Sequence, residues 1–235
     1  MVSDQKVTFD TGYYENNGTI KKTISLNNKC VSSFWGLLKK DGFDLMQELN
    51  NFKNKITDSD DVHTISEKLK THFEGLKILD SDDELGFHLA GYVGNEPALK
   101  HVFHVVWLKE NQFLNEYSNY ESHSPLSNNE QQVVIGYQKN KFKLEFPILF
   151  NGENSLPNII INGIMLYRDR INYFDFSEAE AKNFLILMIN TAINLQQFRE
   201  HFQEREGTLI SYPLTFVKIK PNNIINEEIL NDPKK

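Results

Sequence analysis

The stretch that decides the fold is residues 3–36, SDQKVTFDTGYYENNGTIKKTISLNNKCVSSFWG. It contains three segments with strand character. Val2–Phe9 alternates in part, and Thr19–Leu26 alternates with the period of two that a pleated strand requires. Cys30–Trp35 consists of small, apolar and aromatic residues and ends at Gly36, where the backbone can bend or approach a ligand closely. The stretch therefore predicts three consecutive short strands.

Charged residues on two of these segments invite a chemical interpretation. Asp4 and Lys6 are two residues apart, so they lie on the same face of one strand and can converge on one point. Lys22 lies on the next strand, and a lysine beside a carboxylate can be tuned toward a catalytic role. The simpler interpretation is that Lys22 lies on a solvated strand edge and Asp4 in a turn. The local pattern leaves both interpretations open.

The order of three motifs in this stretch resembles a known family. The motifs are Ser-Asp-x-Lys at residues 3–6, Lys-Lys-x-Ile-x-Leu at residues 21–26, and a small-residue strand that ends in Phe-Trp-Gly at residues 34–36. Together they resemble the N-terminal region of proteasome β-subunits. The resemblance is greatest to the bacterial and archaeal proteasome-like N-terminal-nucleophile (Ntn) hydrolases.

The resemblance implies roles for four residues. Asp4 and Lys22 match the acidic residue and the lysine that flank the nucleophile in the family. Gly36 matches the glycine whose N–H stabilises the oxyanion. Lys6 stands where the family usually has arginine. We therefore expect Asp4, Lys6, Lys22 and Gly36 to form the catalytic surroundings, with Lys22 close to Asp4.

The family's nucleophile is the N-terminal threonine, serine or cysteine of a preceding strand, exposed by processing. This sequence begins with Met1 at the second strand of that pattern, and neither Met1 nor Val2 can act as the nucleophile. We therefore expect either about 10–20 further residues upstream, enough for one hairpin partner, or another segment beside Val2–Phe9. Asn222–Leu230 is the best internal candidate for that segment.

Composition excludes several other classes of function. The chain of 235 residues is long enough for one large domain or two small ones, and 40% hydrophobic and 24% charged residues are ordinary for a globular protein. A net charge of −7 argues against nucleic-acid and anionic-membrane partners. Cys30 is the only cysteine, which excludes an intrachain disulfide, and neither a signal peptide nor a membrane-spanning run is evident. The cytoplasm is the expected location.

Apolar spacing predicts three main helices. Gly42–Ile56 and Val62–Phe73 carry apolar residues at intervals of three and four, so we expect two helices side by side on one sheet face. Ser177–Gln203 begins with the capping box Ser-x-x-Glu and is apolar on most sides, which favours burial between layers or against another subunit.

The middle of the chain predicts further strands. Gly86–Val93 and His101–Leu108 are expected to be strands joined around residues 94–97. Asn111–Gln131 is polar and is expected to be a loop, followed by a short strand at Gln132–Tyr137. Residues 138–176 receive no assignment.

Two groups of residues suggest a metal site, but in both the spacing of the possible ligands argues against metal binding. His101 and His104 are three residues apart, so on a strand they lie on opposite faces and cannot bind one ion together, which argues against a zinc site with His88. Asp80–Glu84 lacks the glycine and the alternating ligands of a calcium loop. The sequence therefore predicts no metal and no cofactor.

The resemblance implies an α+β fold, a four-layer αββα sandwich of two antiparallel sheets between helices. We expect a single Ntn-hydrolase-like domain over residues 1–220, with a divergent insertion at about 138–176 and a polar C-terminal tail at 221–235. Ser211-Tyr212 replaces the family's double glycine and Thr215 its aspartate, which fits a divergent or inactive member.

The expected function is a non-catalytic, proteasome-like homo-oligomer, with a ring or stacked rings possible, since no N-terminal threonine, serine or cysteine is present. One alternative is an active threonine-peptidase-like amidohydrolase whose N-terminus lies upstream of Met1, with a peptide or amide substrate. Another is an unrelated α+β binding module.

Overall fold

The computed structural model of the protein describes residues 1–4, 20–80, 83–105, 111–118, 134–135, 148–149, 177–203, 212–220 and 225–232. In this part of the chain the fold is α+β, and the strand pairs with a described register are antiparallel, as the sequence predicts. The chain separates into two compact units. The first comprises Met1, Lys22–Asn119 and Val217–Glu228, and the second comprises Val2–Lys21, Tyr120–Phe216 and Ile229–Lys235.

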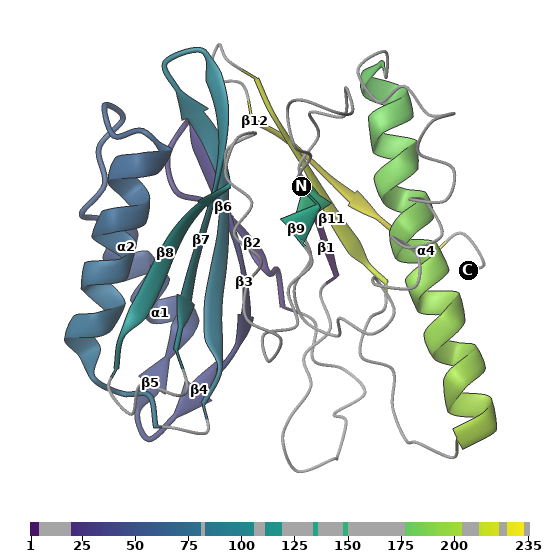
Figure 1. Ribbon diagram of the computed structural model, residues 1–235, viewed down its shortest axis with the longest axis horizontal. Helices are drawn as coiled ribbons and strands as arrows, with labels where there is room; N and C mark the ends of the chain where they lie inside the picture. Colours follow the sequence, from purple (N-terminus) through teal and green to yellow (C-terminus); the bar gives the residue numbers. More distant parts are fainter. Residues whose placement is uncertain are drawn as a thin grey trace. The chain divides into compact units, whose positions relative to one another are not determined.

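A five-stranded antiparallel sheet is the main structure of the first unit, with the order β2-β3-β6-β7-β8. Its strands are β2 (Thr23–Ser25), β3 (Cys30–Gly36), β6 (Leu85–Val93), β7 (Glu96–His104) and β8 (Phe113–Ser118). The first three fall in segments where the sequence predicts strands. Figure 1 shows the sheet with helices on one side.

Directly paired residues share a face of the sheet, so the register divides its residues into two sets. Phe34 pairs with Phe87, and Phe87 with Val102; all three belong to the hydrophobic core beneath the helices. We call this side the helix face. Trp35 and its partner Gly86 lie on the opposite side, which we call the second face.

Two helices cover the helix face (Figure 1). Helix α1 (Leu45–Lys53) buries Leu45, Leu49 and Phe52, and α2 (Val62–Leu76) buries Val62, Ile65, Ser66, Leu69 and Phe73. Both helices agree with the prediction, although α1 is shorter than Gly42–Ile56. It begins at Leu45 because the Asp44 carboxylate caps it, accepting from the amides of Met46 and Gln47 at 3.0 and 3.1 Å.

A short hairpin precedes α1 and extends into the start of the helix that the sequence predicts over Gly42–Ile56. Its strands are β4 (Lys39–Lys40) and β5 (Phe43–Asp44). Asp41 and Gly42 form the turn with φ values of 42° and 88°, the sign that a two-residue turn between antiparallel strands prefers. The positive φ values therefore delay the helix until Leu45.

Strands β6 and β7 form a hairpin that is tighter than the sequence predicts. Gly94, with φ of 60°, and Asn95 form a two-residue turn, so Glu96 already pairs with Val93. Strand β7 thus begins five residues earlier than the expected His101. Proline has no N–H to donate, but Pro97 fits inside β7 because the pairing with β8 starts only at Leu99. No hydrogen bond of the β7–β8 ladder is therefore lost at position 97.

Strand β8 lies where the sequence predicts a loop. Phe113 is buried against Phe73, with ring centroids 6.1 Å apart, and its amide donates to the Glu74 carboxylate at 2.9 Å. The next helix-face position is Asn115, whose side-chain amide donates to Ser66 of α2 at 3.1 Å and to Glu67 at 2.7 Å. Because the polar residue Asn115 occupies a core-facing position, the sequence lacks the alternation of apolar and polar residues that predicts a strand.

A three-stranded sheet has the order β1-β11-β12. Strand β1 (Val2–Asp4) pairs antiparallel with β11 (Leu214–Ile219), with Val2 opposite Phe216 and Asp4 opposite Leu214. Strand β12 (Ile225–Leu230) lies within the segment expected to be a polar tail. It neighbours β11, so the expectation that Asn222–Leu230 lies beside Val2–Phe9 is wrong for the described residues of β1. Two further short strands, β9 (Val134–Ile135) and β10 (Ile148–Leu149), pair with each other.

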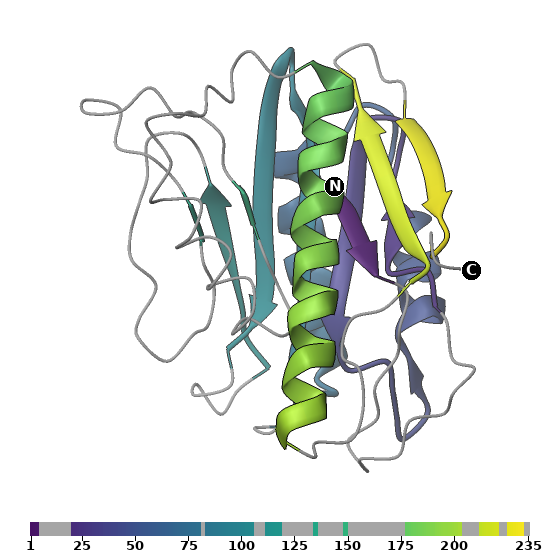
Figure 2. The same cartoon turned by 90° about the vertical axis from the view of Figure 1, so that its right-hand side faces the viewer.

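The capping box of the third helix is confirmed. Helix α4 (Glu178–Gln203) is shown from the side in Figure 2. It follows Ser177, whose amide donates to the Glu180 carboxylate at 2.7 Å. The Ser177 hydroxyl also contacts that carboxylate at 2.6 Å. The helix buries Met188, Ala192, Ile193 and Gln196, whereas Leu187 and Phe198 remain 62% and 65% exposed. None of the described helices is long and apolar enough to cross a membrane.

Phe73 tests the packing of α2 on the sheet. Its ring lies 4.7 Å from that of Phe87 and is 1% exposed, so Phe73→Ala should leave a cavity and destabilise the protein by about 3–5 kcal/mol. Urea denaturation followed by circular dichroism measures this. The control is Thr71→Ala on the exposed side of α2, which should change the unfolding free energy by no more than about 0.5 kcal/mol. Equal effects of the two substitutions would contradict the packing described here.

Candidate functional site

Gly36, the expected oxyanion donor, ends β3 in a backbone conformation that favours glycine. Its φ is +88°, and a Cβ at this position would lie 2.0 Å from the carbonyl oxygen of Glu84. The neighbouring amide of Leu37 donates to the same Glu84 carbonyl at 2.7 Å. The close approach of β3 to Glu84 therefore requires glycine at position 36, independently of any catalytic role.

The direction of the Gly36 N–H follows from the hydrogen bonds of its neighbours. Successive amides along a strand point to opposite sides, and the Leu37 amide points toward Glu84, which immediately precedes β6. The Gly36 N–H therefore points away from β6, toward the side of β3 where β2 lies. This direction is compatible with a donor that serves a ligand.

Lys22 immediately precedes β2 and is half-buried. Its carbonyl oxygen accepts from the Phe34 amide at 3.2 Å, which continues the β2–β3 ladder by one pair. Position 22 therefore lies opposite Phe34 and belongs to the helix face. Lys22 and Gly36 thus lie on neighbouring chain segments, with Gly36 two residues beyond the partner of Lys22.

The structure does not test the positions of the other two expected site residues relative to Lys22 and Gly36. Asp4 is the last residue of β1, opposite Leu214, and belongs to the second unit, whereas Lys22 belongs to the first. The pairing of Asp4 with Lys22 stays a prediction. Lys6 lies outside the described residues.

Four rings gather on the second face of the five-stranded sheet: Trp35, His88, His101 and Phe103, which we call the ring cluster. The Trp35 ring centroid lies 5.2 Å from each imidazole, and the two imidazole centroids are 5.0 Å apart. His101 stacks on Phe103 at 4.2 Å with an interplanar angle of 17°. Gly86 makes room for Trp35, because a Cβ there would lie 2.0 Å from the indole ring.

Burial keeps both histidines of the ring cluster neutral. His88 is 8% exposed and His101 is 1% exposed. Desolvation lowers the pKa of His88 to about 3. Desolvation, and then the nearby His88, hold the pKa of His101 well below its usual value. The pair therefore presents two uncharged imidazoles at pH 7.

The register aligns polar residues in a row across the second face. Thr23 of β2 pairs with Ser33 of β3, which pairs with His88; His88 pairs with His101, and His101 with Glu116 of β8. Glu116 is placed by its backbone, and its side chain lies outside the described part of the structure. Among the described side chains, no group of three or more His, Cys, Asp or Glu is arranged to hold a metal ion.

His104 lies on the opposite face from His101, as the sequence predicts. Its Nδ1 donates to the carbonyl of Asp83 at 3.0 Å, and its ring lies 5.8 Å from that of Phe113. The Asp83 carboxylate contacts Lys40 at 2.7 Å, and Lys40 also pairs with Asp80. The lysine ammonium therefore lies between two of the carboxylates that the sequence suggested as metal ligands.

Sequence reasoning missed the facing histidines, although the signal was present. Counting outward from the two-residue turn Gly94-Asn95 pairs Val93 with Glu96 and then His88 with His101. Spacing along one strand separates His101 from His104 but says nothing of the pairing across the hairpin, which places His88 opposite His101. A tighter turn assignment would have brought His88 and His101 together.

A buried lysine lies beneath α2. Lys100 is 7% exposed and pairs with Leu89 on the helix face. Burial lowers its pKa, and the negative charge of Glu67 acts in the opposite direction. Together with Asn115 and Ser66, these groups form a polar junction between α2 and the sheet, which we interpret as structural.

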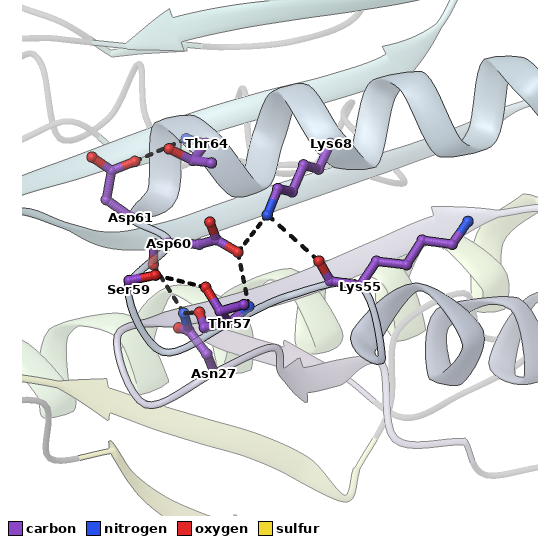
Figure 3. Close-up of polar contacts among 8 residues, drawn as sticks. All are labelled: Asn27, Lys55, Thr57, Ser59, Asp60, Asp61, Thr64 and Lys68. Carbon is purple, nitrogen blue, oxygen red and sulfur yellow. Dashed lines mark hydrogen bonds and ion pairs between the residues drawn. The ribbon is translucent and has the colours of Figure 1, made fainter.

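A second polar network fixes the loop between α1 and α2 (Figure 3). The Asn27 side-chain amide donates to the carbonyls of Thr57 and Asp60 at 3.0 and 2.9 Å. The Asp60 carboxylate accepts from the Thr57 amide at 2.8 Å and from Lys68 at 2.6 Å. The neighbouring Asp61 caps α2. These hydrogen bonds join the loop to Asn27 and to Lys68 of α2, so we interpret the network as structural.

Comparisons with known proteins add no relative. No protein-family model matches the chain, and no curated protein matches it either. The resemblance to Ntn hydrolases thus depends on the motifs quoted above.

Gly36 and Gly42 allow a matched test of the approach to Glu84. Both have φ of +88°, but a Cβ at Gly42 would meet nothing within 4 Å. Gly36→Ala should therefore destabilise the protein by more than Gly42→Ala, which incurs only the backbone strain of about 1–3 kcal/mol. Urea unfolding of both variants measures the difference. Equal effects would show that the contact with Glu84 does not restrict position 36.

The network in Figure 3 predicts a pH dependence for Asp60. The hydrogen bond from Lys68, followed by that from the Thr57 amide, holds the Asp60 pKa below its ordinary value of 3.8. The ionised form is therefore favoured in the folded state, and this stability is fully present above pH 3.8 and is lost as the pH falls through the lowered pKa. At pH 7, Asp60→Asn should cost about 1–2 kcal/mol.

Urea unfolding at several pH values tests this dependence. The difference between the wild type and Asp60→Asn should shrink as the pH falls below about 4. Asp58→Asn, an exposed change in the same loop, is the control and should have little effect at any pH. A difference that stays constant down to pH 2.5 or so would contradict the proposed ionic contribution.

Proposed function

We propose that this chain is a proteasome-like protein with the Ntn-hydrolase fold that acts as a non-catalytic structural or binding subunit. The order of its elements supports the proposal. Strands β2 and β3 precede the helix pair α1 and α2, the strands β6, β7 and β8 follow, and α4 leads to the last strands, β11 and β12. The motifs of the resemblance occur in the same order.

The proposal includes the four-layer αββα arrangement in a single domain over residues 1–220. In that arrangement the five-stranded sheet and the sheet β1-β11-β12 stack face to face, α1 and α2 cover one sheet and α4 covers the other. The helix pair on one face of the five-stranded sheet supports one half of this arrangement. Antiparallel pairing in both sheets also agrees with it.

The observation that carries the non-catalytic interpretation is the register of Lys22. Position 22 lies opposite Phe34, on the face that α1 and α2 cover. A catalytic lysine must instead reach the carbonyl under attack together with the nucleophile. The close approach to Glu84 is enough to explain why position 36 is a glycine, so the glycine does not by itself indicate an oxyanion role.

One observation favours the alternative of an active threonine-peptidase-like amidohydrolase. The Gly36 N–H points away from β6, so the β3–β6 ladder does not use it and it could serve as an oxyanion donor. In that case a processed threonine, serine or cysteine from upstream of Met1 would attack a peptide or amide carbonyl. Lys22 and Asp4 would assist the proton transfer, and Lys6 would complete the charged surroundings.

We also propose a homo-oligomer larger than a dimer. Leu187 and Phe198 of α4 remain exposed although both are large and apolar, which suits a surface that another subunit covers. No nucleic-acid partner is proposed, because the net charge is −7.

Peptide hydrolysis and particle mass together test the proposal. The native protein should be used, so that any processed N-terminus is present. We expect no hydrolysis of fluorogenic peptides, no covalent adduct with probes for N-terminal nucleophiles, and a mass by light scattering above twice 27.4 kDa.

The contrary outcomes separate the alternatives. Hydrolysis that Lys22→Ala abolishes and Lys21→Ala retains would establish the active amidohydrolase. A monomer without hydrolysis would favour an unrelated α+β binding module. Lys21 is a suitable control because it is the exposed neighbour of Lys22.

A further inference from the structure

A histidine on α2 lies between two oppositely charged groups that come from α1 and from the residues after it. The side chain of His72 is 6% exposed, and its ring centroid lies 5.4 Å from that of Phe52 on α1 and 5.2 Å from that of Phe73. The Lys55 ammonium lies 2.9 Å from the imidazole Nδ1, and the Glu48 carboxylate lies 3.5 Å from Nε2. The imidazole therefore connects α2 both to α1 and to the loop that follows α1.

The contact with Lys55 depends on the protonation state of His72. An ammonium group can only donate, so Nδ1 must be unprotonated to accept the hydrogen bond at 2.9 Å. The single proton of the neutral ring is then on Nε2, the nitrogen that faces Glu48. A second proton on Nδ1 would remove the acceptor and place a positive ring beside a positive ammonium group. The Lys55 contact is therefore available only to the neutral imidazole.

The charged groups around His72 favour the neutral ring. Burial, followed by the positive charge of Lys55, lowers the pKa of His72 below its ordinary value of 6.5, and the more distant Glu48 carboxylate acts in the opposite direction. On α2 itself, Lys68 lies one turn before His72, but its ammonium contacts the Asp60 carboxylate at 2.6 Å. The aromatic rings that pack against the imidazole are uncharged.

Lys55 also belongs to the turn that ends α1. Its amide donates to the Phe52 carbonyl at 2.8 Å, and the next amide, that of Ile56, donates to the Lys53 carbonyl at 3.2 Å. The Lys55 carbonyl in turn accepts from the Lys68 ammonium at 3.5 Å (Figure 3). A change at the Lys55 side chain therefore acts on the start of the loop between α1 and α2.

We propose that His72 makes a pH-sensitive contact between α2 and the loop after α1, which forms when the imidazole is neutral and breaks when Nδ1 is protonated. Protonation would release the Lys55 side chain, leave the ring beside Glu48 and loosen the turn at residues 54–56. The inference is independent of the proposed function, because it concerns contacts within this chain and requires neither a substrate nor another subunit.

The sign of the pH dependence follows from the contact. The unfolded chain binds the proton of His72 more readily than the folded protein does. The stabilisation from the neutral imidazole is therefore fully present above pH 6.5, the ordinary pKa, and is lost as the pH falls from there through the lowered pKa of the folded state.

NMR titration of the histidine ring, assigned by its absence from His72→Gln, tests the charged surroundings. The wild-type pKa of His72 should lie below 6.5. Lys55→Met removes the ammonium but keeps the aliphatic chain, so it should raise this pKa, whereas Glu48→Gln should lower it further. The matched control is Lys53→Met, which changes an exposed lysine in the last turn of α1 and should leave the pKa of His72 as in the wild type.

Hydrogen exchange tests the loosening of the turn. In the wild type, the protection factors of the Lys55 and Ile56 amides should fall between about pH 7 and about pH 5. In Lys55→Met they should be low at both pH values. The internal control is the Ile65 amide of α2, which donates to the Asp61 carbonyl at 2.9 Å and should keep its protection, so that a local opening is distinguished from general destabilisation.

Three results would each overturn the proposal. They are a wild-type His72 pKa at or above 6.5, the same pKa in Lys55→Met and Lys53→Met, and protection at Lys55 and Ile56 that does not change with pH. If His72→Gln fails to fold, sequential assignment of the wild-type resonances replaces it. The variants at positions 48, 53 and 55, which leave the buried imidazole in place, then provide the whole test.

Discussion

The register between β3 and β6 is the constraint on which the described part of the first unit depends. Two glycines allow it. Gly36 lets β3 approach the carbonyl of Glu84, and Gly86 leaves space for the ring of Trp35. A shift of one residue would exchange the two faces of β3, bringing Phe34 out of the core beneath α1 and α2. The side chains on each face of β3 therefore depend on Gly36 and Gly86, where a Cβ atom would collide with Glu84 and Trp35.

The helices were largely predictable from the sequence because their signals are local. Val62, Ile65, Leu69 and Phe73 recur at helical spacing, and these are the apolar residues that α2 buries. The capping box of Ser177 and Glu180 also involves only neighbours in the sequence. By contrast, β8 was missed because Asn115 occupies a core-facing position and finds its partners, Ser66 and Glu67, on α2. No local pattern reports a partner that lies about fifty residues away.

The candidate site also combines a feature that a local sequence signal predicts with features that depend on pairing between strands. A glycine that ends an apolar strand predicts a bend or a close approach to a ligand at position 36, and the structure shows a close approach to the Glu84 carbonyl. The face on which Lys22 lies depends on its pairing with Phe34, which the sequence does not state. The facing pair of His88 and His101 required only the length of one turn, and the prediction placed that turn over four residues instead of two. A difference of two residues in the expected turn is therefore enough to hide the pairing of the two histidines.

The two faces of the sheet accommodate polar groups by different means. On the helix face, Lys100 is buried close to Glu67, so its charge has an opposite charge nearby. On the second face, His88 and His101 avoid the cost of a buried charge by remaining neutral. Neutral imidazoles still carry a donor and an acceptor each, whereas a hydrophobic pair would fill the same space without that requirement. The histidines therefore add specificity to the β6–β7 register, because a slipped hairpin would separate them and place them against different neighbours.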